Sequence, residues 1–128
     1  AYKFPAEEAT TRDGLIVVYS SRVRTLLDAV YDWARFGSLP HGYQWIRREL
    51  AERRVTPAAL VATTLRYGDR GTIRRMGALL ERCGVRTGLV RELSDALPGT
   101  SGTIPWIPTR PKRGTLNRRW GLIMNGEI

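Results

Sequence analysis

The sequence has very little of what metal sites and nucleophilic active sites require. It contains one histidine, His41, and one cysteine, Cys83, far apart along the chain. The sequence therefore has too few ligands for a zinc site of the usual kind, and it gives no support for a Cys–His catalytic pair. A single cysteine also excludes an internal disulfide. We expect Cys83 to be a small buried hydrophobic residue. We expect His41 to be a solvated loop imidazole rather than a general base.

Long apolar runs are also missing. The longest, residues 15–19, has the length of a strand, whereas a membrane-spanning helix needs roughly 18 apolar residues. The N-terminus shows no secretory signal, so we expect a cytoplasmic protein with no membrane partner. The pair Gly68 and Gly71 lacks the Lys and Ser/Thr of a phosphate-binding loop. No metal and no cofactor are predicted.

Acidic residues are few, with 12 Asp and Glu against 21 Lys and Arg. Asp28 and Asp32 are four residues apart on one predicted helix, and this spacing would allow them to share a metal ion. Arg24 and Arg35 stand beside them, however, so ion pairing within the helix is the simpler expectation. Because no cluster of carboxylates or histidines is visible, we predict that the protein is not an enzyme.

Positive charge is what the sequence has in excess. The net charge is +9 and the isoelectric point is about 10.8, which favours a polyanionic partner such as nucleic acid or an acidic protein surface. No Asp or Glu occurs between Asp95 and Glu127. That stretch carries the candidate binding residues Arg110, Lys112, Arg113, Arg118 and Arg119. The alternative, a solvated loop with no ligand, remains open.

Two tryptophans, Trp106 and Trp120, flank this basic stretch. One interpretation is that they stack on a nucleic-acid ligand or support cation–π contacts. The other is that two indoles close a β-rich end of the core, and the sequence does not decide between them. Tyr31, Trp33 and Trp45 lie on or near apolar helix faces, so we expect them in the core.

Residues 73–85 form the clearest single element. Five apolar residues recur at three- and four-residue spacing on one helix face: Ile73, Met76, Leu79, Leu80 and Cys83. Gly84 stands where a left-handed C-terminal cap needs glycine. Gly77 costs about 1 kcal/mol in a helix relative to alanine, which indicates close packing against another element. We expect Arg74 and Arg75 to point away from the apolar face and to extend the basic surface.

Further helices are predicted on both sides of this one. Ser20 or Ser21 caps a first helix that carries apolar residues as far as Ala34. Residues 37–42 are predicted as a loop. A second helix follows up to about Arg53, a third runs from Thr56–Pro57 to Gly68 with Leu60, Val61 and Leu65 buried, and a short one carries Leu89 to Leu97.

Strands are predicted at the two ends of the chain. Residues 15–19 read as a buried strand, 2–4 as a possible short strand and 7–14 as polar turn. Residues 104–108 contain too many prolines for a central strand and suit a sheet edge. Residues 110–119 are a basic loop and 120–124 a final strand.

The predicted fold class is α+β, with about four or five central helices packed with short strands from the N- and C-terminal ends. It is not a winged helix-turn-helix. We expect residues 1–14 to be a linker segment and residues 15–128 to be a single domain.

Three blocks in order resemble a known family. They are residues 24–28 (RTLLD), residues 67–69 (YGD) followed by 75–84 (RMGALLERCG), and residues 119–125 (RWGLIMN). Their order and spacing are similar to those of the C-terminal domain of AbiEi-type antitoxins, over about residues 15–125. Residues 36–43 depart from the family pattern as a long loop.

The resemblance implies an antitoxin of a type IV toxin–antitoxin (abortive infection) system. Such a protein is a transcriptional regulator that represses its own promoter and counteracts a cognate nucleotidyltransferase toxin. Operator DNA and that toxin are the implied partners. The family's N-terminal winged helix has no counterpart in residues 1–14, so we expect the C-terminal antitoxin domain alone. The resemblance carries over no catalytic residue.

Two functional hypotheses follow. In the first, this antitoxin domain uses its basic surface for operator DNA, for the toxin, or for both. In the second, the chain is a basic nucleic-acid-binding or protein-interaction module without an antitoxin role. A small nucleic-acid enzyme would need a carboxylate or histidine cluster that the sequence lacks.

Overall fold

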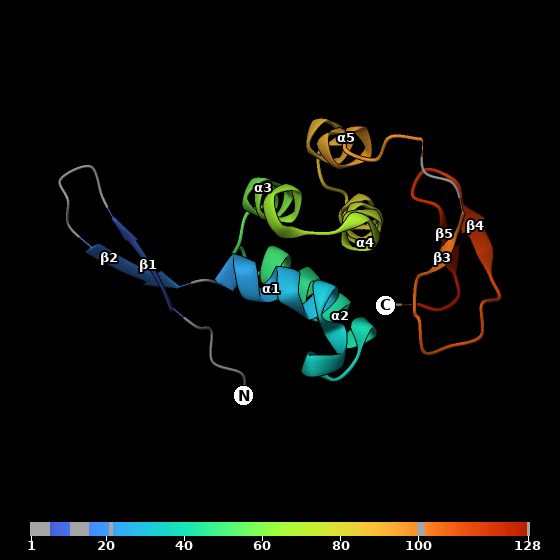
Figure 1. The fold of residues 1–128 in the computed structure, drawn as a ribbon, viewed down its shortest axis with the longest axis horizontal. Coiled ribbons are helices and arrows are strands. Elements are labelled where there is room, and N and C mark those ends of the chain that lie inside the picture. The colour runs from blue at the N-terminus through green and yellow to red at the C-terminus, as the bar shows by residue number, and fades with distance from the viewer. Residues whose placement is uncertain (1–5, 11–15, 21, 100–101, 128) are drawn as a thin grey trace.

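Helices occupy the middle of the chain and strands its two ends, so the fold is α+β as the sequence predicts (Figure 1). The computed structural model describes residues 6–10, 16–20, 22–99 and 102–127. Within them lie five α-helices, one short 3-10 helix, a two-stranded hairpin and a three-stranded sheet. No helix in this part of the chain is long and apolar enough to cross a membrane.

The hairpin consists of β1 (Ala6–Thr10) and β2 (Ile16–Ser20), which pair antiparallel with Glu8 opposite Val18. The strand predicted at 15–19 is confirmed with a shift of one residue. The turn predicted at 7–14 is wrong for its first four residues, because they supply the backbone partners of β2. The strand proposed at 2–4, the residue Leu15 and the capping residue Ser21 lie outside the described residues.

The first two α-helices are separated by a short 3-10 helix. Helix α1 (Arg22–Tyr31) ends before the 3-10 helix η1 (Trp33–Phe36), and α2 (Leu39–Ala51) follows. The first helix was therefore predicted too long, and the loop predicted at 37–42 is wrong from Leu39 onward.

The start of α2 was readable from the sequence and was missed. The Ser38 hydroxyl accepts a hydrogen bond from the His41 N–H at 3.3 Å, as an N-cap does, and Pro40 occupies the first turn. Gly42 belongs to the helix as well: a Cβ there would lie 2.6 Å from the Ala29 carbonyl oxygen. The glycine permits a close crossing of α1 and α2.

Burial differs from the prediction on the outer helix faces. Tyr31 is 51% exposed and Leu65 is 38% exposed, so neither belongs to the core. Trp33 and Trp45 are partly buried and pack against the core rather than inside it. Trp33 lies beyond the end of α1, in η1, so the helical periodicity that placed it on the apolar face does not apply to it.

The next three helices lie where the sequence predicts them. They are α3 (Pro57–Tyr67), α4 (Arg70–Arg82) and α5 (Thr87–Asp95). The Thr56 hydroxyl accepts from the Ala59 N–H at 3.1 Å, and Asp69 Oδ1 accepts from the Thr72 N–H at 2.8 Å. Gly84 adopts φ +77°, which confirms the left-handed turn after α4.

The C-terminal sheet has the order β3–β5–β4. Strand β3 (Ile104–Pro105) runs parallel to β5 (Leu122–Met124), and β4 (Thr115–Asn117) runs antiparallel to it. The proline-containing strand is at the edge, as predicted. The loop predicted at 110–119 is wrong over three residues, because it contains β4.

A single apolar cluster joins the helices to this sheet. Helix α4 contributes most of one face of it, with Met76, Leu79 and Leu80 all fully buried. Cys83 is half-buried and packs against the edge of the cluster. Burial raises the pKa of its thiol above the ordinary value. Figure 1 shows α4 as the helix beside the C-terminal sheet.

Candidate nucleic-acid interface

Trp120 is a core residue and cannot stack on a ligand. Only 1% of its surface is exposed, because its ring lies directly over Gly77 of α4. Its indole N–H donates to Glu81 Oε1 at 3.2 Å. The close packing expected of Gly77 is thus confirmed, and its partner is Trp120, which precedes β5. The ligand-stacking interpretation of Trp120 is wrong.

Trp106 is also in the core, with no exposed surface. Its ring stacks on Tyr43 of α2 with centroids 3.8 Å apart and planes 9° from parallel. The Tyr43 hydroxyl donates to the Trp106 carbonyl oxygen at 2.8 Å, and burial raises the pKa of Tyr43 so that this donor keeps its proton. The structure therefore favours the second interpretation of the tryptophan pair, in which the indoles close the β-rich end.

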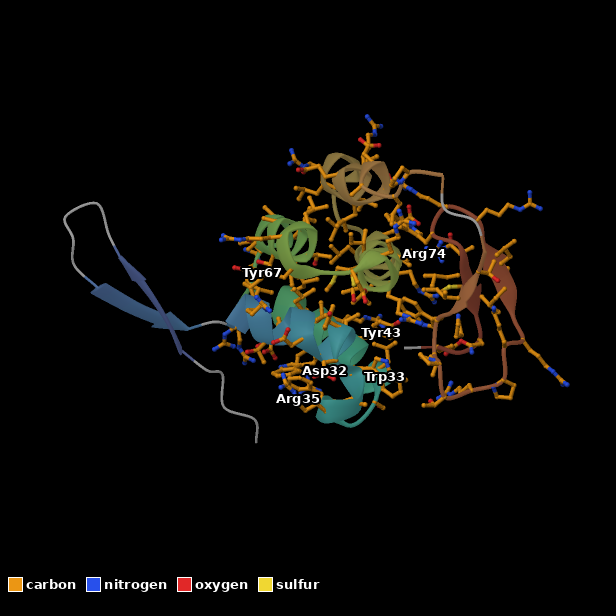
Figure 2. All side chains as sticks on the ribbon, viewed as in Figure 1. Asp32, Trp33, Arg35, Tyr43, Tyr67 and Arg74 are labelled. Carbon is orange, nitrogen blue, oxygen red and sulfur yellow. The ribbon has the colours of Figure 1, made fainter. Side chains whose placement is uncertain are left out.

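The two arginines of α4 do not extend an exposed basic surface in the predicted way. Arg74 is only 6% exposed, and Figure 2 places it on the side of α4 that faces the C-terminal sheet. Its guanidinium lies close to Gly121, and the prediction of an exposed Arg74 is wrong. Arg75 is partly buried and donates from Nε and Nη2 to the Pro105 carbonyl oxygen at 3.2 and 2.8 Å. Burial lowers the pKa of Arg75. It ties α4 to β3.

Replacing Arg74 by methionine is expected to raise the free energy of unfolding by about 1 kcal/mol. Among the described residues its Nε has no hydrogen-bond partner, and an unsatisfied buried polar group costs about 1–3 kcal/mol. Methionine keeps an apolar stem of similar length. Urea unfolding followed by tryptophan fluorescence measures the change.

The matched control is Arg75→Met, one residue away. It should lower the free energy of unfolding by about 1.5–3 kcal/mol, because it removes charged donors that bond the Pro105 carbonyl. Equal destabilisation by the two substitutions would contradict our description of Arg74.

The five basic residues of the C-terminal segment remain as the exposed candidates: Arg110, Lys112, Arg113, Arg118 and Arg119. Three precede β4 and two follow it, so about 10 Å of extended strand separates the two groups. Arg119 forms an ion pair with Glu81 and lies over the Trp120 ring at 5.2 Å from its centroid. Lys112 Nζ donates to the Thr103 carbonyl oxygen at 2.9 Å.

Asn125 fixes the backbone that carries the first group, Arg110, Lys112 and Arg113. Its side-chain oxygen accepts from the Ile107 N–H at 2.8 Å, and its amide donates to the Ile107 and Pro111 carbonyl oxygens at 2.8 and 3.2 Å. Because one side chain binds both ends of the 107–111 turn, the backbone that presents Arg110 to Arg113 has a defined conformation. Sequence reasoning did not single out Asn125, although it ends the third family-like block.

Several of the remaining titratable groups in the described part of the chain form ion pairs. Among the described residues no three His, Cys, Asp or Glu side chains are placed to hold a metal ion. Asp28 pairs with Arg24 at 3.3 Å within α1, which confirms the predicted ion pairing there. Asp32 also pairs with Arg35 at 3.3 Å, but Asp32 immediately precedes η1 and Arg35 lies in it, so the prediction of one helix that carries both aspartates is wrong. His41 is exposed on the first turn of α2 and not in a loop.

Glu49 is the one fully buried carboxylate in the described part of the chain, and it serves to join elements. Its two oxygens accept from Arg22 at 2.7 Å and from Arg54 at 2.9 Å. The contact links the start of α1 to the end of α2. A carboxylate held by two guanidinium groups is an ion pair rather than a general base.

The structure also brings together arginines that the sequence did not connect. Arg47 of α2, Arg82 of α4 and Arg86 before α5 line a cavity of about 510 Å³. They are 35 and 39 residues apart from the first to the others, so no local pattern could have indicated the site.

Comparisons with protein-family models, with curated proteins and with solved structures give no match for this chain.

Proposed function

We propose that this chain is the antitoxin domain of an AbiEi-like toxin–antitoxin system and that it assists repression by holding the phosphate backbone of operator DNA. Two things support the proposal. The three sequence blocks resemble that family, and the exposed cations around β4 have no acidic neighbour in their own segment. The outward-facing basic group, braced by Asn125, is the observation on which the DNA role rests.

Duplex DNA suits this surface better than single strands. Proteins that bind single strands stack bases on exposed aromatic side chains, and both tryptophans of this region are buried. Arginine and lysine without stacking partners bind phosphates, which position a protein on a duplex without reading its sequence. The domain therefore adds affinity, and sequence recognition belongs to another domain, such as the family's winged helix.

Replacing Arg110, Lys112, Arg113 and Arg118 by serine is expected to weaken duplex binding at least about a hundredfold at low salt. Each phosphate contact contributes about 0.9 to the slope of log affinity against log salt, so four losses should reduce the slope by about 3 to 4. Arg119 is left in place because it pairs with Glu81. Fluorescence anisotropy with a labelled duplex from 50 to 300 mM salt measures both quantities.

A control variant carries the same charge change elsewhere. Its serines replace four exposed arginines outside the segment: Arg48, Arg66, Arg70 and Arg91. We expect a slope close to that of the unaltered chain. If both variants lose affinity equally, the net charge and not this surface is responsible, and the DNA role of the loop is lost.

The antitoxin role is tested in cells. Co-expression of the chain with a nucleotidyltransferase toxin of an AbiEi-type system should restore growth. We propose that both proteins act in the cytoplasm. The loop variant is the chain with Arg110, Lys112, Arg113 and Arg118 replaced by serine. Rescue of growth by this loop variant would separate antitoxicity from DNA binding. If the chain instead co-purifies with a partner, binds no DNA and gives no rescue, it is a protein-interaction module.

A further inference from the structure

The cavity between α2, α3 and the α4–α5 turn is a mixed surface of cations and apolar side chains. Its volume of about 510 Å³ lies within the range of small-molecule sites. Arg47, Arg82 and Arg86 supply the charge, and Leu50, Pro57 and Val85 supply apolar wall. Such a site can bind a ligand that combines an anionic group with a flat apolar ring.

All three arginines line the cavity, and none of them forms an ion pair in the described part of the chain. Elsewhere in this protein arginines near an acid pair with it, as Arg22 and Arg54 do at Glu49. One carboxylate, Glu127, is close by, and it lines an adjoining cavity of about 280 Å³ together with Arg47, Arg82 and Cys83. The excess of guanidinium groups over carboxylates leaves the larger cavity positive.

The positive charge of the arginines acts on Cys83, which lines the cavity. The charges of Arg47 and Arg82 act on the Cys83 thiol and lower its pKa, against the stronger effect of burial that raises it. Two guanidinium groups thus lie near the thiol that both cavities share. Cys83 is the only cysteine of the chain, so it can report on whatever occupies the site.

We propose that this cavity binds a phosphorylated nucleoside, with the phosphate between Arg47, Arg82 and Arg86 and the base against Leu50, Pro57 and Val85. Guanidinium groups bind phosphate oxygens in pairs, which gives the group a preferred direction. A lone inorganic phosphate would leave the apolar wall unused. The ligand is either a free nucleotide or the 5′-phosphorylated end of a strand, since both present the same chemistry.

The first experiment is isothermal titration of the full chain with adenosine 5′-monophosphate. Adenosine without phosphate, and inorganic phosphate without nucleoside, should each bind at least about tenfold more weakly, because each lacks one half of the contacts. Arg82→Gln with Arg86→Gln should weaken the nucleotide by a similar factor. The matched pair Arg66→Gln with Arg91→Gln, exposed on α3 and α5, should leave it unchanged.

Alkylation of Cys83 provides a second readout that does not depend on heat of binding. Saturating nucleotide should slow the reaction of Cys83 with iodoacetamide at least about threefold, and the same concentration of adenosine should slow it less, because adenosine lacks the phosphate contacts to the arginines. Thermal unfolding of each variant establishes that it is folded. Duplexes with and without a 5′-phosphate then distinguish the sources: a preference for the phosphorylated end assigns the site to strand ends, and no preference assigns it to free nucleotides.

Absence of nucleotide binding at millimolar concentration in the folded chain would overturn the proposal, as would equal loss in the control pair. Neither result bears on duplex binding around β4, because the serine variant of that surface keeps Arg47, Arg82 and Arg86. Conversely, the loop variant should bind the nucleotide normally even if it no longer binds DNA.

Discussion

Gly77→Ala is expected to destabilise the protein by about 3 kcal/mol or more, although alanine is the better helix former. A Cβ at this position would lie 2.6 Å or less from three carbons of the Trp120 ring. Overpacking of this kind costs about 1–3 kcal/mol, occasionally more, and neither side can retreat cheaply. Gly77 is in the centre of α4, and Trp120 is fully buried and bonded to Glu81.

The same substitution at Gly88 should have the opposite sign. Gly88 lies in the first turn of α5, and a Cβ there meets nothing within 4 Å. Alanine is favoured over glycine in helices by up to about 1 kcal/mol, so we expect a small stabilisation. Urea unfolding and the melting temperature of the two single variants measure the contrast. A stable Gly77→Ala variant would show that the C-terminal sheet does not pack on α4 as described.

Trp106→Ala is expected to cost about 3–5 kcal/mol, the range for removal of a buried aromatic side chain. That is a large fraction of the 5–15 kcal/mol that holds a typical domain folded. The substitution removes the stack on Tyr43 and leaves a cavity between α2 and the C-terminal segment. Because Asn125 and the basic turn rest on the next residue, Ile107, duplex affinity should fall as well, without any change in charge.

Two variants isolate the cause. Trp106→Phe retains a ring that can stack on Tyr43, so it should lose less stability and keep most of the duplex affinity. Leu116→Ala, in β4 and 42% exposed, should change stability by about 0.5 kcal/mol or less. Near-ultraviolet circular dichroism and urea unfolding follow the core, and anisotropy follows binding. A Trp106→Ala variant as stable as the unaltered chain would contradict the burial of this indole.

Features controlled by neighbouring residues were predictable from the sequence. Thr56 and Gly84 each act within three or four residues, and the structure has the helix start and the turn where those residues indicate. Asp69 caps α4 at the same short range, but it was not predicted as a cap. The missed start of α2 belongs to the same class, since Ser38 and Pro40 carry a local signal. Gly77 was identified as a site of close packing because a helical glycine needs a reason, but its partner was not.

The sequence by itself determined the α+β class, most helix boundaries, the edge position of Pro105 and the excess of positive charge, because hydrogen bonding within a turn and net charge are local or additive. Only the tertiary structure decided which side chains face water. Arg74 and Trp120 come from segments about 46 residues apart, and the packing of one segment on the other buries them both. The same long-range packing gathers Arg47, Arg82 and Arg86 around one cavity, which no spacing along the chain could reveal.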